Sequence, residues 1–260
     1  MLARLLSSTA VSAIAHRGGS SLRPENTLAA FDHAATLGVD AMECDVRLAR
    51  DAGPVVIHDE TLERTTDASE AVARLTMDEI RGADAGYQFS AEDGSFPFRG
   101  KGLRVPTLPE VLAWLPAGVG LVVEVKAREA TEAAVELLRG SRVRAAGAAS
   151  VISFDPEALN RAHALDPGLM TGYLLVPGES FDRALIFAVE HGHGAVHPWE
   201  GDLGLDPAPL LLQAVAYGRQ VGCYVVNEPN RMRHLAAVGL WGFVTDLPRV
   251  AREALGPPAS

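Results

Sequence analysis

Residues 41–58 read AMECDVRLARDAGPVVIH, and this stretch decides which architecture the whole chain adopts. Apolar runs at 41–47 and 55–58 flank a turn sequence, Asp51-Ala52-Gly53-Pro54. Their connection is too short for a helical crossover, which needs about a dozen residues or more. The stretch therefore predicts an antiparallel hairpin, with 55–58 as its return strand.

Further apolar or β-branched runs have the pattern of strands that are buried on both faces. They lie at 10–16, 121–126, 150–154, 171–176, 195–197, 221–226 and 242–246. Helical patterns lie between many of them, at 27–37 (with Asn26 as the expected N-cap), 155–165, 181–190, 209–217 and 229–238. Setting the return strand aside leaves eight strands, which predicts an α/β fold of the closed (β/α)₈ TIM-barrel type.

Residues from about 60 to 106 interrupt this alternation with glycines and polar residues. Only 77–81 has a helical pattern there, with Thr76 as its N-cap. We interpret 60–106 as a small insertion over one face of the barrel, and 1–260 as a single barrel domain. The tail, 256–260, is expected to be frayed.

Composition and charge exclude several classes of protein. Hydrophobic residues make up 48% and charged residues 22%, which is a globular balance. No uncharged apolar run reaches the ~18 residues of a transmembrane helix. The formal net charge of −10 and the lack of a basic face argue against nucleic-acid binding.

The N-terminal segment, 1–15, faintly resembles a signal peptide. Cleavage there would remove the first predicted strand, so we discount the signal and expect a cytoplasmic protein. Cys44 and Cys223 lie in apolar contexts and are expected to be buried, reduced thiols. His163, His191, His193 and His234 lie in helices or at helix ends and are expected at the surface.

Acidic and histidine side chains gather near the predicted strand ends. Glu43 and Asp45 are two residues apart, so their side chains point to the same side of the sheet. Glu124 lies in the strand at 121–126, His16 ends the first strand, and the hairpin returns His58 to the level of Glu43. In a barrel the carboxyl ends of the strands converge on one mouth, so we expect these side chains to meet.

Three clustered carboxylates in a partly dry site need a counter-charge. A hard divalent cation, Mg²⁺ or Ca²⁺, supplies one and prefers oxygen ligands. The alternative is a structural ion-pair network with Arg17 and Lys126. Histidines beside a metal are suited to acid–base chemistry near neutral pH. Arg17 and Lys126 are suited to a phosphoryl group, so the residues together predict a metal site that handles phosphate.

These residues stand in motifs that resemble the glycerophosphodiester phosphodiesterase family. The motifs are HRGG (16–19), PENT (24–27), ECDV (43–46), VIHD (56–59), TLERTT (61–66), VPTL (105–108), VEVK (123–126), SFDP (153–156), VNEP (226–229) and VTD (244–246). The resemblance runs from about residue 12 to 250, and a set in this order is highly specific.

The resemblance implies a (β/α)₈ barrel with an insertion after the hairpin. By position it implies Glu43, Asp45 and Glu124 as metal ligands, His16 and His58 as the acid–base pair, Arg17 and Lys126 as phosphate contacts, and Glu25 and Asn26 as supporting residues. Members use a divalent cation, Ca²⁺ or Mg²⁺, to cleave glycerophosphodiesters to glycerol 3-phosphate and an alcohol. The adjacent glycerol hydroxyl attacks, one histidine takes its proton and the other protonates the leaving alkoxide.

Two features leave alternatives open. The hairpin turn is about one residue longer than the family usually has, which affects where His58 lies. Phe154, Trp199 and Tyr224 are expected to form an apolar wall of the substrate pocket, although Tyr224 fits a core position equally well.

A lysophospholipase D-type enzyme on the same barrel is one alternative function. A non-catalytic phosphate-binding barrel is the other, and it predicts loss of a histidine or a carboxylate, whereas all five are present.

Overall fold

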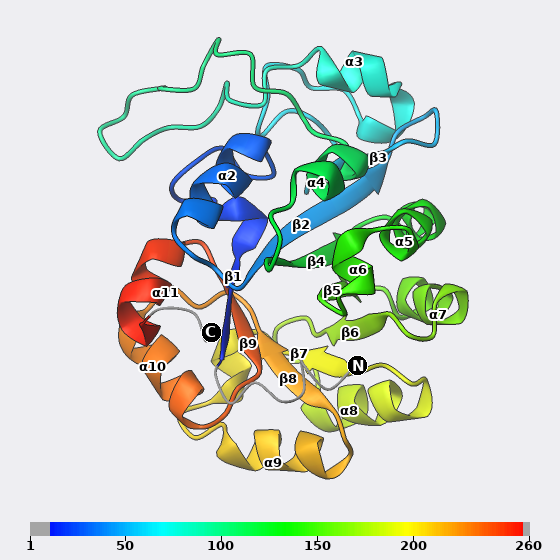
Figure 1. Cartoon of the computed structure of the whole chain (residues 1–260), viewed down its shortest axis with the longest axis vertical. Helices are drawn as coiled ribbons and strands as arrows, with labels where there is room; N and C mark the ends of the chain where they lie inside the picture. Colours follow the sequence, from blue (N-terminus) through cyan, green and yellow to red (C-terminus); the bar gives the residue numbers. More distant parts are fainter. Residues whose placement is uncertain (1–10, 257–260) are drawn as a thin grey trace.

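The computed structural model describes residues 11–256, which build a closed barrel of parallel strands with helices outside it (Figure 1). The strands are β1 (Ser12–Ala15), β2 (Ala41–Leu48), β3 (Pro54–Val56), β4 (Gly120–Val125), β5 (Ala149–Ser153), β6 (Met170–Leu174), β7 (Ala195–His197), β8 (Gln220–Cys223) and β9 (Gly242–Thr245). Barrel neighbours follow chain order, and β1 closes the barrel by pairing with both β2 and β9. The predicted TIM barrel is confirmed.

The helices agree with the predicted ones where a prediction was made. They are α2 (Leu28–Thr36), α3 (Met77–Arg81), α4 (Leu108–Trp114), α5 (Thr131–Arg139), α6 (Arg142–Ala145), α7 (Pro156–Leu165), α8 (Phe181–Glu190), α9 (Ala208–Ala216), α10 (Pro229–Ala237) and α11 (Pro248–Leu255). The sequence patterns did not single out α4, α5, α6 and α11. Asn26 is not the N-cap of α2: the hydroxyl of Thr27 accepts the hydrogen bond from the amide of Ala30.

The hairpin forms as predicted. β3 runs antiparallel to β2, with Val56 opposite Val46 and Pro54 opposite Leu48. The extra residue stays in the turn, where Ala52 takes a φ of 62°. The amide of Ile57 still donates to the carbonyl of Asp45 at 3.0 Å. The two strands therefore stay hydrogen-bonded up to the residue before His58.

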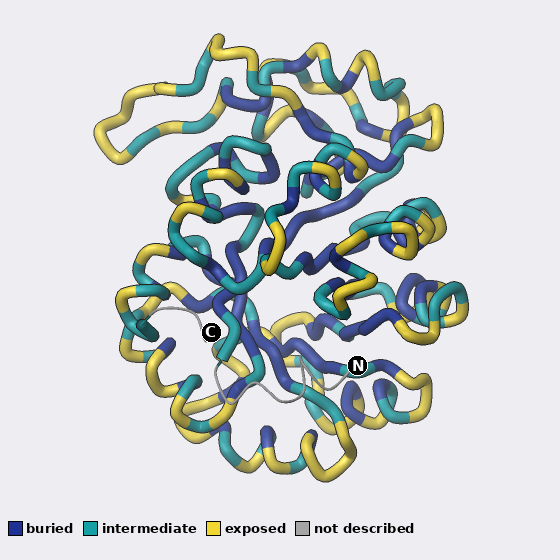
Figure 2. The backbone as a smooth tube through the Cα atoms, viewed as in Figure 1, coloured by how far each residue is buried: buried dark blue, intermediate teal, exposed yellow. Residues whose placement is uncertain are grey.

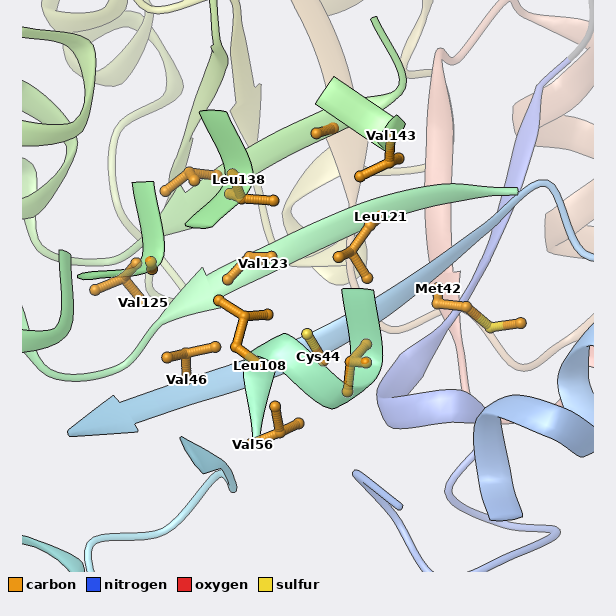
Figure 3. Packing of buried hydrophobic residues seen from close by; sticks show 14 of the residues in the cluster. Met42, Cys44, Val46, Val56, Leu108, Leu121, Val123, Val125, Leu138 and Val143 are labelled. Carbon is orange, nitrogen blue, oxygen red and sulfur yellow. The ribbon is translucent and has the colours of Figure 1, made fainter. Parts of the chain in front are cut away.

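Alternation along β2 and β4 separates a packing face from a chemical face. Met42, Cys44 and Val46 of β2 are buried among residues of β4 and α4, including Leu108 (Figure 3). Fully burying one such side chain contributes about 1.5–3 kcal/mol. The residues between them, such as Glu43, point to the other face, into the barrel. Packing on the outside therefore fixes which side chains reach the inside.

The insertion has a small core of its own. Leu62, Val72 and Ile80 pack with Val55 and Ile57 of the hairpin. The predicted α3 is confirmed, and Thr76 caps it with a reciprocal hydrogen bond to Glu79. The insertion lies at the upper end of the view in Figure 1, and much of its outer loop is exposed (Figure 2). Its core anchors the segment that follows His58.

The structure also shows where the cysteines and one of the helix-associated histidines lie. Cys44 and Cys223 are buried, free thiols, as expected. The surface position expected for His193 is wrong, because the residue is fully buried between Thr171 and Asn160. Within this range we find no helix with the length and apolar character to cross a bilayer. The signal-like segment up to residue 10 and the tail after residue 256 lie outside the described residues.

Candidate active site

His16 is placed by a tight turn at the end of β1. The 3-10 helix His16–Gly18 follows the strand, and Gly18 has a φ of 81°. A Cβ at Gly18 would lie 2.8 Å from the Cβ of Ala30, so only glycine fits there. The turn directs Nδ1 of His16 to 2.5 Å from Oδ1 of Asp246, the residue after β9.

Asp246 is a strongly held carboxylate. Besides His16, the hydroxyl of Ser20 donates to it at 2.6 Å and the amide of Asn227 donates at 2.8 Å. Burial alone would raise the pKa of Asp246, but the hydrogen bonds from His16, Ser20 and Asn227 hold this pKa well below its usual range. Asp246 is therefore ionised and orients the His16 ring.

His58 has a carboxylate partner of the same kind. Its Nδ1 lies 2.6 Å from Oδ1 of Asp59, and the other carboxylate oxygen, Oδ2, accepts a hydrogen bond from Nε of Arg64. Burial opposes ionisation of Asp59, but the hydrogen bonds from Arg64 and His58 lower its pKa to about 2. Burial, offset in part by Asp45, lowers the pKa of His58 below its ordinary value.

Glu43, Asp45 and Glu124 form an acidic cluster inside the barrel mouth. β2 and β4 set Asp45 directly beside Glu124, and one oxygen from each of the three carboxylates lies within 4.8 Å of the others. All three residues are buried. Burial and the neighbouring carboxylates raise the pKa of Glu43 well above its usual value and that of Glu124 to about 7.

The cluster contains buried oxygens that are left for a ligand. The backbone amide of Arg17 donates to Oε2 of Glu43 at 2.9 Å, and Lys126 donates to Oε1 of Glu124 at 2.7 Å. Oε1 of Glu43 and Oδ1 of Asp45 are buried without any hydrogen-bond partner among the described residues. Unpartnered, buried oxygens in a cluster of three carboxylates are a donor set that fits a hard divalent cation.

The first loop supports this cluster through Glu25 and Asn26. Nη1 of Arg17 donates to Glu25 at 2.8 Å, while its Nε lies 3.1 Å from Oδ2 of Asp45. The amide of Asn26 donates to the same Asp45 oxygen at 2.8 Å. Arg17 is thus held between Glu25 and Asp45, in the position expected of a residue that Glu25 orients.

A cavity of about 260 Å³ opens above these side chains. It is lined by His16, Arg17, Glu43, His58, Glu124, Lys126, Ile152, Phe154, Leu174, His197, Tyr224, Val225 and Val244. Phe154 and Tyr224 meet edge to face, with ring centroids 5.7 Å apart, and form an apolar wall. Charged groups and this wall therefore face one space.

Trp199, which was expected in the apolar wall, is not among the residues that line this cavity. β7 ends at His197, and the chain then turns so that the indole ring packs over Gly201. Trp199 is 42% exposed. His197 occupies the barrel interior instead, where its ring lies against the backbones of Gly172 and Gly222.

Sequence reasoning assigned no role to Asp59, Arg64, Asn227 and Asp246. Asp59 directly follows His58, and Asp246 ends a predicted strand, so a search for carboxylates beside the histidines and strand ends would have found both. Arg64 stands in the TLERTT motif, but the motif does not indicate which residues it contacts, because those contacts depend on how the insertion folds.

A parallel barrel that gathers carboxylates, histidines and two cationic side chains at one mouth defines an α/β-barrel hydrolase for phosphorylated substrates. The chain belongs to the glycerophosphoryl diester phosphodiesterase family, whose model matches residues 16–250. The resemblance of its motifs to this family is confirmed.

Individual relatives agree with this assignment. A glycerophosphodiester phosphodiesterase of Bacillus subtilis (strain 168) is 30% identical over 263 residues, covering 94% of this chain and 86% of the relative. A phosphodiesterase structure from Oleispira antarctica, in complex with the product sn-glycerol-3-phosphate, superposes with a TM-score of 0.82 at 27% identity and covers 95% of this chain and 97% of that one. A glycerophosphodiester phosphodiesterase structure from Agrobacterium tumefaciens C58 gives 0.79 at 25% identity, covering 94% and 99%.

Proposed function

We propose that this chain hydrolyses glycerophosphodiesters to glycerol 3-phosphate and an alcohol, with a divalent cation, Mg²⁺ or Ca²⁺, as cofactor. One observation carries the proposal: two histidines, each oriented by its own carboxylate, face the same cavity as the acidic cluster. Family membership supports the same substrate class. In this proposal the chain is one barrel domain, and the insertion contributes Arg64 to the surroundings of the site.

The two histidines would share the proton transfers. Nδ1 of His16 faces Asp246 and Nδ1 of His58 faces Asp59, which leaves Nε2 of each ring for the substrate. One Nε2 accepts the proton of the glycerol hydroxyl next to the phosphate as that oxygen bonds to phosphorus. The other donates a proton to the leaving alkoxide as its P–O bond breaks. Water then opens the cyclic phosphate to glycerol 3-phosphate.

Glu43, Asp45 and Glu124 would hold the cation. When bound, it supplies Lewis-acid chemistry and positive charge for the phosphate. Arg17 and Lys126 line the cavity and would bind the phosphate oxygens, Arg17 with its planar guanidinium and Lys126 as a point charge. Together with the cation they outweigh the three carboxylates, which explains how a chain with a net charge of −10 attracts an anionic diester.

The apolar wall would receive the uncharged parts of the substrate. Phe154 and Tyr224 lie on one side of the cavity, and Nζ of Lys126 lies 5.6 Å from the Phe154 ring centroid. A diester whose phosphate lies at Lys126 would therefore place a carbon chain against Phe154. A cavity of about 260 Å³ suits a small headgroup ester.

The test is release of glycerol 3-phosphate from glycerophosphocholine, with Mg²⁺, Ca²⁺ and EDTA in parallel. We expect release with one or both ions and none with EDTA. Choline release from lysophosphatidylcholine separates the alternatives, because a lysophospholipase D-type enzyme cleaves this lipid to lysophosphatidic acid and choline. Choline release from the lysolipid, without release of glycerol 3-phosphate from glycerophosphocholine, would indicate such an enzyme. Absence of release from either substrate would favour a non-catalytic phosphate-binding barrel.

A further inference from the structure

Arg64, in the insertion, makes contacts that the proposed chemistry does not use. Its Nε donates to Oδ2 of Asp59 at 2.5 Å. Its Nη1 and Nη2 donate to the two carboxylate oxygens of Glu25 at 2.7 and 2.8 Å. Arg64 is not among the residues that line the cavity. A single guanidinium thus joins two carboxylates that come from different loops.

Each of those carboxylates holds one residue of the site. Asp59 lies 2.6 Å from the Nδ1 of His58, and Glu25 accepts a hydrogen bond from Arg17 at 2.8 Å. One carboxylate therefore separates Arg64 from the histidine proposed for proton transfer, and another separates it from the arginine proposed for phosphate binding. The connection crosses 39 residues of sequence, from the loop before α2 to the insertion.

We propose that Arg64 is a positioning residue, which fixes the His58 ring and the Arg17 guanidinium relative to each other through Asp59 and Glu25. This inference rests on the proposed function. A guanidinium presents its donors in a rigid planar fork, so it sets the direction of both carboxylates at once. A lysine ammonium in its place has no such fork.

The competing interpretation is an ion pair that only stabilises the insertion. The Arg64 side chain is 48% exposed, whereas that of Glu25 is 14% exposed. An ion pair with so exposed a partner contributes little to folding. Its loss would still leave the half-buried Glu25 with Arg17 as its only cationic partner among the described residues, and Asp59 free to rotate with His58. The two interpretations therefore differ in whether activity or stability changes.

The variants are Arg64→Ala and Arg64→Lys, with Arg74→Ala as the matched control. Arg74 lies in the same insertion and pairs with Glu70 at 3.7 Å, away from the site. A displacement of about 1 Å at a reacting group costs up to about 100-fold, so we expect Arg64→Ala to lower kcat/KM on glycerophosphocholine by about 10- to 100-fold, with a fall in kcat. The Tm should change by no more than about 4 °C. Arg64→Lys should recover only part of the loss, and Arg74→Ala should equal the wild type.

Two further readouts separate positioning from structure. Added guanidinium ion should restore activity to Arg64→Ala, while methylammonium should not. The loss in the Arg64→Ala/Asp59→Asn double variant should be smaller than the product of the two single losses, because both act on His58. Wild-type kcat/KM in Arg64→Ala, or a loss that follows Tm and is not rescued by guanidinium, would overturn the proposal.

Binding of inorganic phosphate tests the same residue without hydrolysis. In the presence of Mg²⁺, calorimetry should show about 10-fold weaker phosphate binding for Arg64→Ala than for the wild type, because Arg17 is less well held. Equal affinities would count against the positioning role. A wild-type chain that binds phosphate in this Arg64-dependent way but hydrolyses neither substrate would overturn the proposed function alone.

Discussion

Nδ1 of His16 lies 2.5 Å from Oδ1 of Asp246, although the two residues are 230 positions apart in the chain. The contact exists because β1 and β9 are neighbours in the closed barrel, with Ala15 paired to Thr245. His16 and Asp246 each follow directly on one of these paired residues. Closure of the sheet therefore brings together the pair His16 and Asp246, which we call the dyad.

The dyad predicts the effect of Asp246→Asn. An amide of the same shape no longer holds the Nδ1 proton as a carboxylate does, so His16 loses its preferred tautomer. We expect kcat on glycerophosphocholine to fall by about 100-fold or more, the contribution typical of a positioned acid or base. Ser20→Ala, which removes one hydrogen bond to Asp246, is the control and should have a smaller effect. An unchanged kcat in Asp246→Asn would show that His16 works without the carboxylate.

The histidines themselves give the second prediction. His16→Ala and His58→Ala should each lower turnover by about 100-fold or more, because each removes one proton-transfer group. His234→Ala changes an exposed histidine of α10 and should leave turnover unchanged. Steady-state kinetics on glycerophosphocholine measures all three. If both site variants kept wild-type rates, the acid–base assignment would be wrong.

Removal of Glu124 should weaken binding of the cation. Glu124→Ala takes one of the three converging carboxylates away, so the midpoint of activation by Mg²⁺ or Ca²⁺ should rise by about 10-fold or more. Calorimetric titration of the metal gives the same comparison without substrate. Glu132→Ala, which removes an exposed carboxylate of α5, is the matched control. A wild-type titration curve for Glu124→Ala would exclude this residue as a ligand.

Because His193 is buried, we expect the protein to lose stability in mild acid. Burial, together with His163 and His191, lowers the pKa of His193 from 6.5 to about 4. The unfolded chain therefore binds a proton near pH 6.5 that the folded chain resists until about pH 4, so stability falls as the pH falls through this window. From pH 7.5 to pH 5 this one group should cost on the order of 2 kcal/mol of unfolding free energy.

The comparison of the wild type with His193→Gln isolates this effect. Glutamine does not titrate but can still make hydrogen bonds to Thr171 and Asn160. Urea denaturation at pH 7.5 and pH 5 should show a smaller pH dependence for the variant than for the wild type. Equal pH dependence in the two proteins would mean that His193 takes up its proton in the folded state near its ordinary pKa.

The sequence was sufficient to predict the barrel because each strand is a short apolar run and the hairpin explains the extra one. Helices with a clear N-terminal signal were also predicted. One is α7, which has Asp155 as its N-cap and begins at Pro156. α6 spans only Arg142–Ala145 and follows α5 after two residues, so neither its length nor its periodicity separates it from a loop. Short, closely spaced helices are stabilised by tertiary packing more than by local pattern.

Strand periodicity is sufficient to predict that the carboxylates of the site converge, whereas it does not predict the contacts of every loop residue. Glu43, Asp45 and Glu124 follow from strand periodicity, which fixes the side on which a residue lies. Trp199 comes after β7 has ended, so that rule no longer gives the direction of its side chain. Arg64 reaches Glu25 through the folded insertion, a contact that no local pattern contains.

The β1–β9 seam also sets when a newly made chain becomes an enzyme. His16 is synthesised 230 residues before Asp246, and their contact forms only when β9 pairs with β1. A ribosome-bound chain that stops short of β9 has its acidic cluster residues but only one of the two oriented histidines. In a refolding experiment the return of turnover would therefore report closure of the barrel, whereas the recovery of helix would report only that the parts have formed.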